Sequence, residues 1–138
     1  MPRPRLTFAC ELDSARLTGL FAGPSVVTHL QALSARVAMM VSDLSPARAA
    51  VVQQLNMAGV PVVGIPLVSY EEGYYFTADN APRAAASYDE WEVWTVEHAL
   101  ARDGVGLDIE PDARFYEADH DQRCQQSLGA RRRHGTKR

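Results

Sequence analysis

The chain has 138 residues, of which 46% are hydrophobic and 22% are charged, a composition typical of one globular domain with a moderate core. Residues 1–122 hold 8 basic and 17 acidic side chains, a net charge of −9, whereas residues 123–138 hold 6 basic and no acidic side chains. This acidic body argues against nucleic-acid binding, because phosphate contacts need a basic face.

The sequence shows neither an apolar targeting segment nor a cysteine motif. No apolar run reaches the roughly 18 residues that a membrane span needs, and no apolar segment of signal-peptide length follows the basic N-terminus. Cys10 and Cys124 do not have the spacing of a metal site or a disulfide framework. We therefore expect a cytoplasmic protein that does not contact a membrane.

Two apolar segments predict the first strands of a sheet. Residues 6–12 predict one strand, and the continuous apolar run 37–41 predicts a second that is buried on both faces. Between them, a turn at 23–25 precedes apolar residues at helical spacing, which predicts a helix over about 25–35.

A second helix is predicted to begin with Ser45 at the N-cap and Pro46 at the first position, and to end at Gly59. Its predicted buried stripe consists of Ala47, Val51 and Leu55.

A third strand is predicted over 60–68, with a bulge or an early end at Pro66, because proline lacks the N–H that a central ladder uses. A polar and aromatic loop follows over 69–79. Asn80 then begins a long helix to about Arg102, and the last strand is predicted over 104–112.

This βαβαβαβ order predicts an α/β fold with a parallel sheet and right-handed crossovers. We expect a partial (half) TIM barrel over residues 1–112 and an irregular, basic, disordered tail over 113–138. No glycine-rich phosphate loop follows a strand, which argues against nucleotide binding.

Acidic residues lie at or just after the end of each predicted strand, and in a (β/α) barrel all such strand ends meet at the face that carries active sites. They are Glu11, Asp43, Glu71 or Glu72, and the pair Asp108 and Glu110. Asp43 can alternatively serve only as a cap of the following helix, since Asp is common in such loops.

The last predicted strand carries carboxylates at alternate positions, Asp108, Glu110 and Asp112, so they would share one face. We take these three as candidate catalytic residues. Candidate substrate-binding residues are Glu11 and Asp43, together with Tyr74 and Tyr75 of the aromatic loop, which would stack on a sugar ring. Alternatively, Tyr74 and Tyr75 only pack over the mouth of the barrel and do not contact a substrate.

The stretch 106–112 resembles the fourth-strand motif Asp-x-Asp-x-Glu of the family 18 glycoside hydrolases, which are chitinase-like TIM barrels. By position, Asp108 matches the first Asp, Glu110 the middle Asp and Asp112 the final Glu that acts as the acid. Pro111 replaces the usual aromatic residue, and the upstream Asp of the fuller motif would fall near Val105 and is absent. Residues 6–112 also resemble the front half of uncharacterised bacterial TIM-barrel proteins with a similar Gly-Leu-Asp-Ile-Glu-Pro strand.

A full barrel needs about 250 residues, and four strands are used by about residue 112. The chain is therefore a small open domain, a half-barrel that forms a homodimer to cover its edges, or the front half of a longer enzyme. The change of composition after about Tyr116 favours the third explanation.

Three functions follow from this interpretation. The first is a fragment of a glycoside-hydrolase-like barrel that needs no cofactor, with Glu110 as general acid beside Asp108. In this short form it is either active or inactive. The second is a metal-dependent barrel in which Glu11, Asp43, Asp108 and Glu110 hold Mg²⁺ or Mn²⁺. The third is a non-catalytic half-barrel or assembly module.

Overall fold

The structure is a computed structural model, and it describes residues 5–110. Four parallel strands form one sheet in the order of the sequence. They are β1 (Thr7–Cys10), β2 (Arg36–Val41), β3 (Val62–Pro66) and β4 (Gly104–Val105). The predicted α/β class with a parallel sheet is therefore confirmed.

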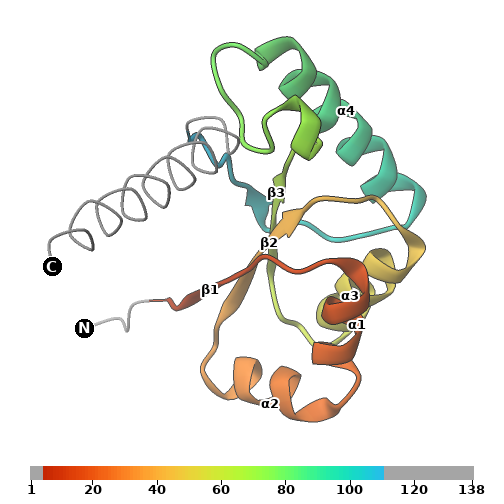
Figure 1. Ribbon diagram of the computed structural model, residues 1–138. Coiled ribbons are helices and arrows are strands. Elements are labelled where there is room, and N and C mark those ends of the chain that lie inside the picture. Colours follow the sequence, from red (N-terminus) through yellow and green to blue (C-terminus); the bar gives the residue numbers. More distant parts are fainter. Residues whose placement is uncertain (1–4, 111–138) are drawn as a thin grey trace, which may run out of the picture.

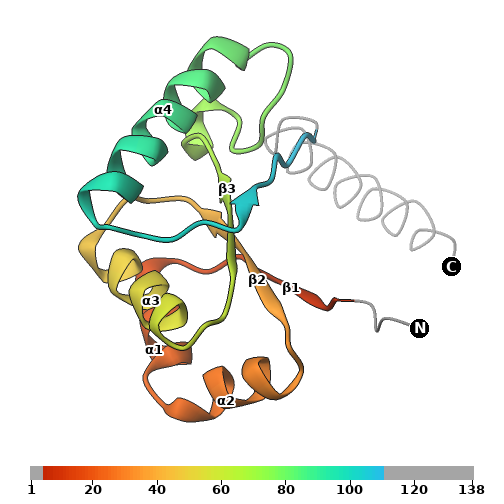
Figure 2. The same ribbon diagram turned by 180° about the vertical axis from the view of Figure 1, so that it is seen from behind.

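The helices gather on one side of this sheet, as Figures 1 and 2 show from opposite directions. They are α1 (Ser14–Phe21), α2 (Pro24–Ala32), α3 (Pro46–Met57), the short 3₁₀ helix η1 (Tyr70–Glu72) and α4 (Ala81–Glu97). No helix within residues 5–110 combines the length and the apolar character needed to cross a membrane.

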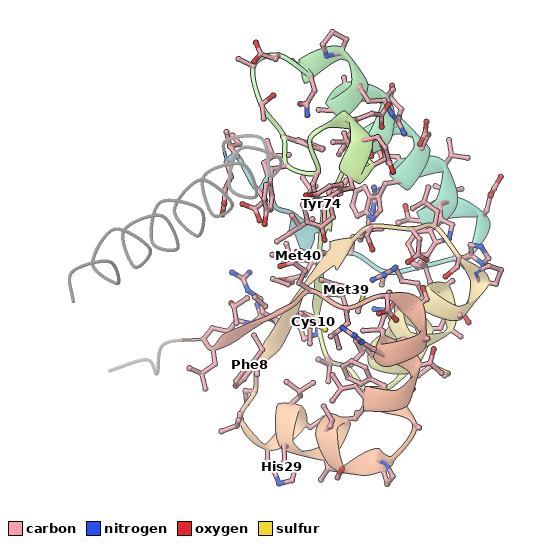
Figure 3. All side chains as sticks on the ribbon, in the orientation of Figure 1. Phe8, Cys10, His29, Met39, Met40 and Tyr74 are labelled. Atoms are coloured by element: carbon pink, nitrogen blue, oxygen red, sulfur yellow. The ribbon has the colours of Figure 1, made fainter. Side chains whose placement is uncertain are left out.

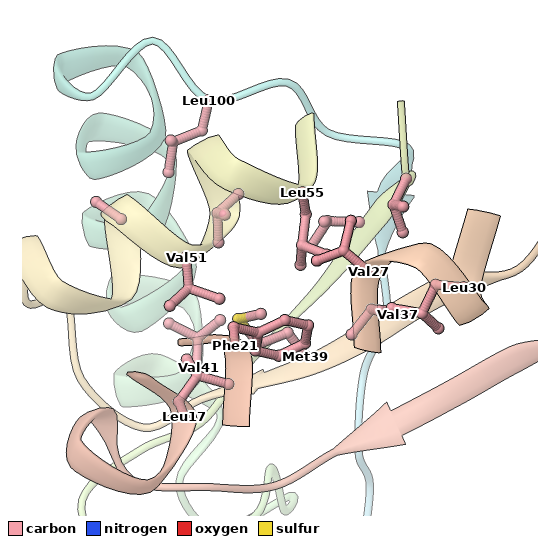
Figure 4. Close-up of a cluster of buried hydrophobic side chains, with 14 of the residues drawn as sticks. Leu17, Phe21, Val27, Leu30, Val37, Met39, Val41, Val51, Leu55 and Leu100 are labelled. Atoms are coloured by element: carbon pink, nitrogen blue, oxygen red, sulfur yellow. The ribbon is translucent and has the colours of Figure 1, made fainter. Parts of the chain in front are cut away.

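The core lies between the sheet and these helices (Figure 4). On β2, the alternate residues Val37, Met39 and Val41 are buried toward the helices, as strand periodicity requires. Met39 and Leu55 are fully buried, and each such side chain stabilises the fold by about 1.5–3 kcal/mol.

The opposite side of the sheet, which we call the open face, carries Ala9, Ala38, Met40, Val63 and Ile65. The strand register places these residues together, because Ala9 pairs with Ala38, Ala38 with Val63, and Met40 with Ile65. None of the helices within residues 5–110 packs on this face in either view (Figures 1 and 2).

The predicted capping of α3 is confirmed. The Ser45 side chain accepts a hydrogen bond from the Arg48 N–H, Pro46 is the first helical residue, and Gly59 has the positive φ of 70° that favours glycine after a helix. The predicted buried stripe is wrong at Ala47, which is exposed, whereas the neighbouring Arg48 is fully buried.

Other boundaries differ from the prediction. Helix α1 was not predicted, although Asp13 caps it and Leu17 and Phe21 are buried at a spacing of four residues. Helix α4 begins after Asn80 as predicted but ends at Glu97, before the expected Arg102. Strand β3 ends at Pro66, which agrees with the predicted early end.

The largest difference concerns the last strand, predicted over 104–112. Strand β4 comprises only two residues, and beyond it a single parallel bridge joins Phe76 and Ile109. Asp112 and the predicted tail 113–138 lie outside the described residues.

Candidate functional site

The loops at the carboxyl ends of the strands carry the candidate site residues. Glu11 directly follows β1 and Asp43 lies just beyond β2, while the aromatic loop 69–79 follows β3 and Asp108 and Glu110 follow β4. Because the sheet is parallel, all of these loops lie at the same end of the sheet.

Tyr74 joins the aromatic loop to the end of β1. Its hydroxyl donates a hydrogen bond of 2.8 Å to Oε1 of Glu11, which is 63 residues away in the sequence. Since β2 lies between β1 and β3 in the sheet, the bond from Tyr74, which Figure 3 labels, joins segments that follow strands on either side of β2. Burial, followed by the bond to Glu11, raises the pKa of Tyr74, so the phenol stays protonated as a donor.

The backbone at Tyr74 has a φ of 65°, in the left-handed region that residues other than glycine rarely adopt. Two backbone bonds hold it there: its N–H donates to the Ser69 carbonyl at 3.0 Å, and its carbonyl accepts from the Val68 N–H at 3.1 Å. Such strain is common where a loop must aim one side chain.

Three tyrosine rings cluster in this loop. The ring centroids of Tyr70 and Tyr74 are 6.4 Å apart, and those of Tyr74 and Tyr75 are 5.0 Å apart in an edge-to-face arrangement. These separations fall in the range of favourable aromatic pairs. Tyr74 and Tyr75, both predicted as substrate-binding residues, are thus brought together.

Polar contacts fix the shape of the aromatic loop. The Asn80 side-chain amide donates to the carbonyls of Tyr75 and Glu72 at 2.8 and 2.9 Å. The Glu72 carboxylate accepts from Ser69 and from the guanidinium of Arg83 on α4. The loop is therefore attached to helix α4 as well as to Glu11.

The same loop contacts the segment after β4. The Phe76 N–H donates to the carbonyl of Asp108 at 3.1 Å. Asp108 is half-buried and Glu110 is exposed. Because the regular ladder of β4 ends at Val105, the strand alternation that predicted a common direction for the carboxylates does not extend to Asp108 and Glu110 as a ladder.

A second cluster surrounds Arg48, which lies on α3 and is completely buried. Its guanidinium donates to the Met40 and Leu12 carbonyls, both at 2.9 Å, and its Nη2 lies 2.7 Å from Oδ2 of Asp43. Arg48 thereby ties the ends of β1 and β2 to the helix layer.

Asp43 is fully engaged in this cluster. Its other oxygen, Oδ1, accepts from the Ser14 hydroxyl at 2.7 Å and from the Ser45 N–H at 3.1 Å. Burial alone would raise the pKa of Asp43, but the hydrogen bonds from Arg48, Ser45 and Ser14 outweigh it and hold the pKa well below its usual range. These bonds give Asp43 a structural role. The sequence had suggested a structural role for Asp43 only as the cap of the following helix.

A groove of about 310 Å³, lined by both polar and apolar residues, adjoins the ends of β2 and β3. Asp43 and Ser69 lie on its strand side, and Arg83, Glu90 and Trp91 on its α4 side. Arg83 is already paired with Glu72 and Glu90, at 3.1 and 2.9 Å.

The described residues offer no obvious metal centre. Within residues 5–110, no three His, Cys, Asp or Glu side chains are grouped so that they could hold a metal ion. Two of the four proposed ligands are engaged elsewhere, since Asp43 pairs with Arg48 and Glu11 accepts from Tyr74. A Mg²⁺ or Mn²⁺ ion at Asp43 would have to displace a buried guanidinium, so this donor set does not fit the metal-dependent interpretation.

Sequence reasoning missed Arg48 and Ser14 as organisers of the strand ends. A charged residue two positions after Pro46 resembles an ordinary exposed helix position, and its partners are as many as 36 residues away. The cap Asp13 before a Leu17–Phe21 pair was the available indication of α1, the helix that supplies Ser14.

Comparison of the chain with protein-family models, curated proteins and solved structures gave no match.

Proposed function

We propose that the four-stranded sheet is half of a (β/α) barrel and that the mouth formed by its strand ends binds and hydrolyses a glycoside. The observation that carries this proposal is the position of the aromatic loop. Tyr74 bonds to Glu11 at the end of β1, and Phe76 bonds to Asp108 after β4, so one loop links carboxylate-bearing segments from both edges of the sheet.

This arrangement suits a carbohydrate. Tyrosine rings offer flat apolar faces for the C–H side of a sugar ring, and carboxylates accept hydrogen bonds from its hydroxyls. The Tyr74 hydroxyl bonds to Oε1 and fixes the position of the Glu11 carboxylate, and the second oxygen would accept a hydrogen bond from a substrate hydroxyl. Glu11 and Tyr74 thus form the binding part of the proposed site.

The catalytic part is assigned to Asp108 and Glu110. Glycoside hydrolysis uses one carboxylic acid to protonate the leaving oxygen and a second carboxylate as base or nucleophile. Glu110 is exposed and free to reach a leaving group, whereas Asp108 is half-buried and held through its backbone by Phe76. We therefore assign Glu110 as the acid and Asp108 as its partner; Asp112 lies outside the described residues.

The test is hydrolysis of a panel of 4-nitrophenyl glycosides and chito-oligosaccharides by the 138-residue chain. We expect Glu110→Gln and Asp108→Asn to lower kcat about 10²–10⁴-fold, the usual contribution of a general acid or base. Glu97→Gln, at an exposed position at the end of α4, serves as the control and should leave kcat unchanged.

Activity that survives both substitutions would refute the catalytic assignment. Binding of an oligosaccharide by calorimetry without any hydrolysis would instead favour a non-catalytic carbohydrate-binding half-barrel.

A further inference from the structure

The groove of about 310 Å³ beside the ends of β2 and β3, which we call the α4 groove, is separate from the residues assigned to the mouth. One wall consists of residues at or just after the ends of the two strands, and the other of residues along one side of α4. Among residues 5–110, its lining does not include Glu11, Tyr74, Asp108 or Glu110. The α4 groove is therefore a second hollow at the carboxyl ends of the strands.

Hydrogen bonds hold the strand-side wall of the α4 groove in place. The buried guanidinium of Arg48 lies behind this wall and donates to Ser42 Oγ at 3.3 Å and to Asp43 Oδ2 at 2.7 Å. The Ser87 hydroxyl on α4 donates to the Leu67 carbonyl at 2.8 Å and so ties the helix to the end of β3. A ligand would meet walls that are already ordered, so binding would cost little conformational entropy.

The lining of the α4 groove combines two kinds of surface. Its apolar part includes Pro66, Leu67, Val68 and Trp91, all of which are buried. Its polar part consists of hydroxyl, carboxylate and guanidinium groups from Ser42, Asp43, Ser69, Arg83, Ser87 and Glu90. A sugar ring has the matching surface, because its C–H groups are apolar and its hydroxyls both donate and accept hydrogen bonds.

The size of the α4 groove limits the ligand to a small one. Sites for drug-sized ligands measure about 300–1,000 Å³, and the α4 groove lies at the lower end of this range. It therefore suits one sugar ring rather than a chain of several rings.

The charges around the α4 groove favour a neutral ligand. Asp43 is paired with Arg48, while Arg83 is paired with both Glu72 and Glu90. These two guanidiniums and three carboxylates sum to a charge of −1. A phosphate or carboxylate ligand would have to compete with two glutamates for Arg83, whereas a neutral hydroxyl compound would not.

We propose that the α4 groove is a second carbohydrate site, which holds one neutral sugar ring apart from the mouth. The inference rests on the proposed function for the class of ligand and extends it to a separate place on the molecule. Glu90 and Asp43 would accept hydrogen bonds from the sugar hydroxyls, and the apolar residues at the end of β3 would contact its C–H groups.

The first test is a titration of the 138-residue chain with glucose and with N-acetylglucosamine, followed by ¹H–¹⁵N spectra. We expect saturable shifts of the amide signals of Ser42, Ser87 and Glu90, with a Kd in the millimolar range for a single ring, about 1–10 mM. Shifts that stay confined to Tyr74, Asp108 and their neighbours, or no shifts at all, would refute the second site.

Two matched pairs of variants test the walls. Ser42→Tyr places a large ring in the α4 groove from an exposed position, and it should raise the Kd at least about tenfold. Ser25→Tyr, at an exposed position on α2, is the control and should leave the Kd unchanged. Equal effects of the two variants would contradict the location of the site.

Glu90→Ala should also raise the Kd about tenfold, because a hydrogen bond to a charged group is lost. Asp89→Ala removes the neighbouring exposed carboxylate on α4, which does not line the α4 groove, and should have no effect. Thermal melts of both variants check that each remains folded. A Kd that is the same in both variants would contradict the role of Glu90.

Ligand charge provides a further test. Glucuronate, which has a carboxylate in place of one hydroxymethyl group of glucose, should bind up to about fivefold more weakly than glucose, the size of an exposed charge interaction. If glucuronate bound more tightly than glucose, the assignment of a neutral ligand would be wrong, and Arg83 would instead mark a site for anions.

The second site and the proposed function can fail separately. Binding of a sugar in the α4 groove by a chain that hydrolyses no glycoside would refute the proposed hydrolysis alone. Hydrolysis that depends on Glu110, without sugar-dependent shifts at Ser42, Ser87 and Glu90, would refute the second site alone.

Discussion

Arg48 is the residue on which the strand ends depend most. It is fully buried, and its guanidinium satisfies two backbone carbonyls as well as Asp43. We expect Arg48→Met to lower the free energy of unfolding by about 3–5 kcal/mol, because it removes the guanidinium that donates to Oδ2 of Asp43 and to the two carbonyls. Urea unfolding of the variant measures this loss.

Arg16→Met is the matched control for that substitution. Arg16 also pairs with an aspartate, Asp13, but its side chain is 78% exposed. An exposed pair contributes about 0–1 kcal/mol. Equal losses for the two variants would contradict the organising role of Arg48.

The lowered pKa of Asp43 predicts how the stability of the protein depends on pH. Its folded-state pKa lies below its ordinary value of 3.8, so its contribution is complete above about pH 3.8 and is lost as pH falls through the lowered pKa. We expect the wild-type protein to lose stability more steeply below pH 3.8 than Asp43→Asn, which cannot titrate. Thermal melts of both proteins from pH 6 to pH 2 check this, and parallel curves would contradict it.

Tyr74 and Tyr88 offer a matched comparison for the binding part of the site. Each hydroxyl donates a 2.8 Å hydrogen bond to a glutamate, Tyr74 to Glu11 and Tyr88 to Glu92 on α4. We expect Tyr74→Phe to raise the Kd for an oligosaccharide about tenfold, since a bond to a charged group contributes about 1.5–3 kcal/mol and Glu11 would lose its fixed position.

Tyr88→Phe should leave that Kd unchanged, because the Tyr88 hydroxyl bonds within helix α4 and does not position Glu11. Calorimetric titration of both variants makes the comparison. If Tyr88→Phe weakened binding as much as Tyr74→Phe, the effect would be one of general stability.

At the scale of the elements, local sequence patterns predicted the strands and helix ends that depend on neighbouring residues. The run 37–41 and the Ser45-Pro46 pair fixed β2 and the start of α3, since burial and capping act within a few residues. Helix α1 was not predicted because it has only eight residues, too few to show a clear helical spacing of apolar residues. The burial of Arg48 in place of Ala47 depends on carbonyls from other elements, which no local pattern contains.

The packing of β3 against α4 depends on one glycine. A Cβ atom added to Gly64 would lie 2.5 Å from Cζ2 of the buried Trp91, so alanine there must displace a rigid ring. We expect Gly64→Ala to lower the free energy of unfolding by about 1–3 kcal/mol, the usual cost of overpacking. Chemical unfolding provides the measurement.

Gly104→Ala on β4 is the control, because a Cβ atom there has no neighbour within 4 Å. It should change the free energy of unfolding by less than about 0.5 kcal/mol in either direction, like most surface substitutions. A loss at Gly104 equal to that at Gly64 would show that the strand backbone, and not Trp91, sets the cost.

At the scale of the whole molecule, the sequence predicted the parallel order of strands but not how the site assembles. The strand order follows from alternating βα patterns and the right-handed crossover. The bond between Tyr74 and Glu11 joins residues 63 apart and depends on the left-handed backbone at Tyr74, which the amino-acid type gives no reason to expect. The position of Glu11 at a strand end was predictable, and its partner was not.

Because β4 is short, the segment that follows it should open more readily than the rest of the sheet. Among residues 5–110, this two-residue strand is flanked by the Asp103 N–H bond to Val62 at 2.8 Å and the Gly106 N–H bond to Gly64 at 2.9 Å. Local opening needs the least free energy where few backbone bonds must break, so the segment that carries Asp108 and Glu110 should exchange its amide hydrogens long before β2 does. A sugar held between Glu11 and Asp108 would slow that exchange, and ligand capture would then be coupled to the ordering of the last strand.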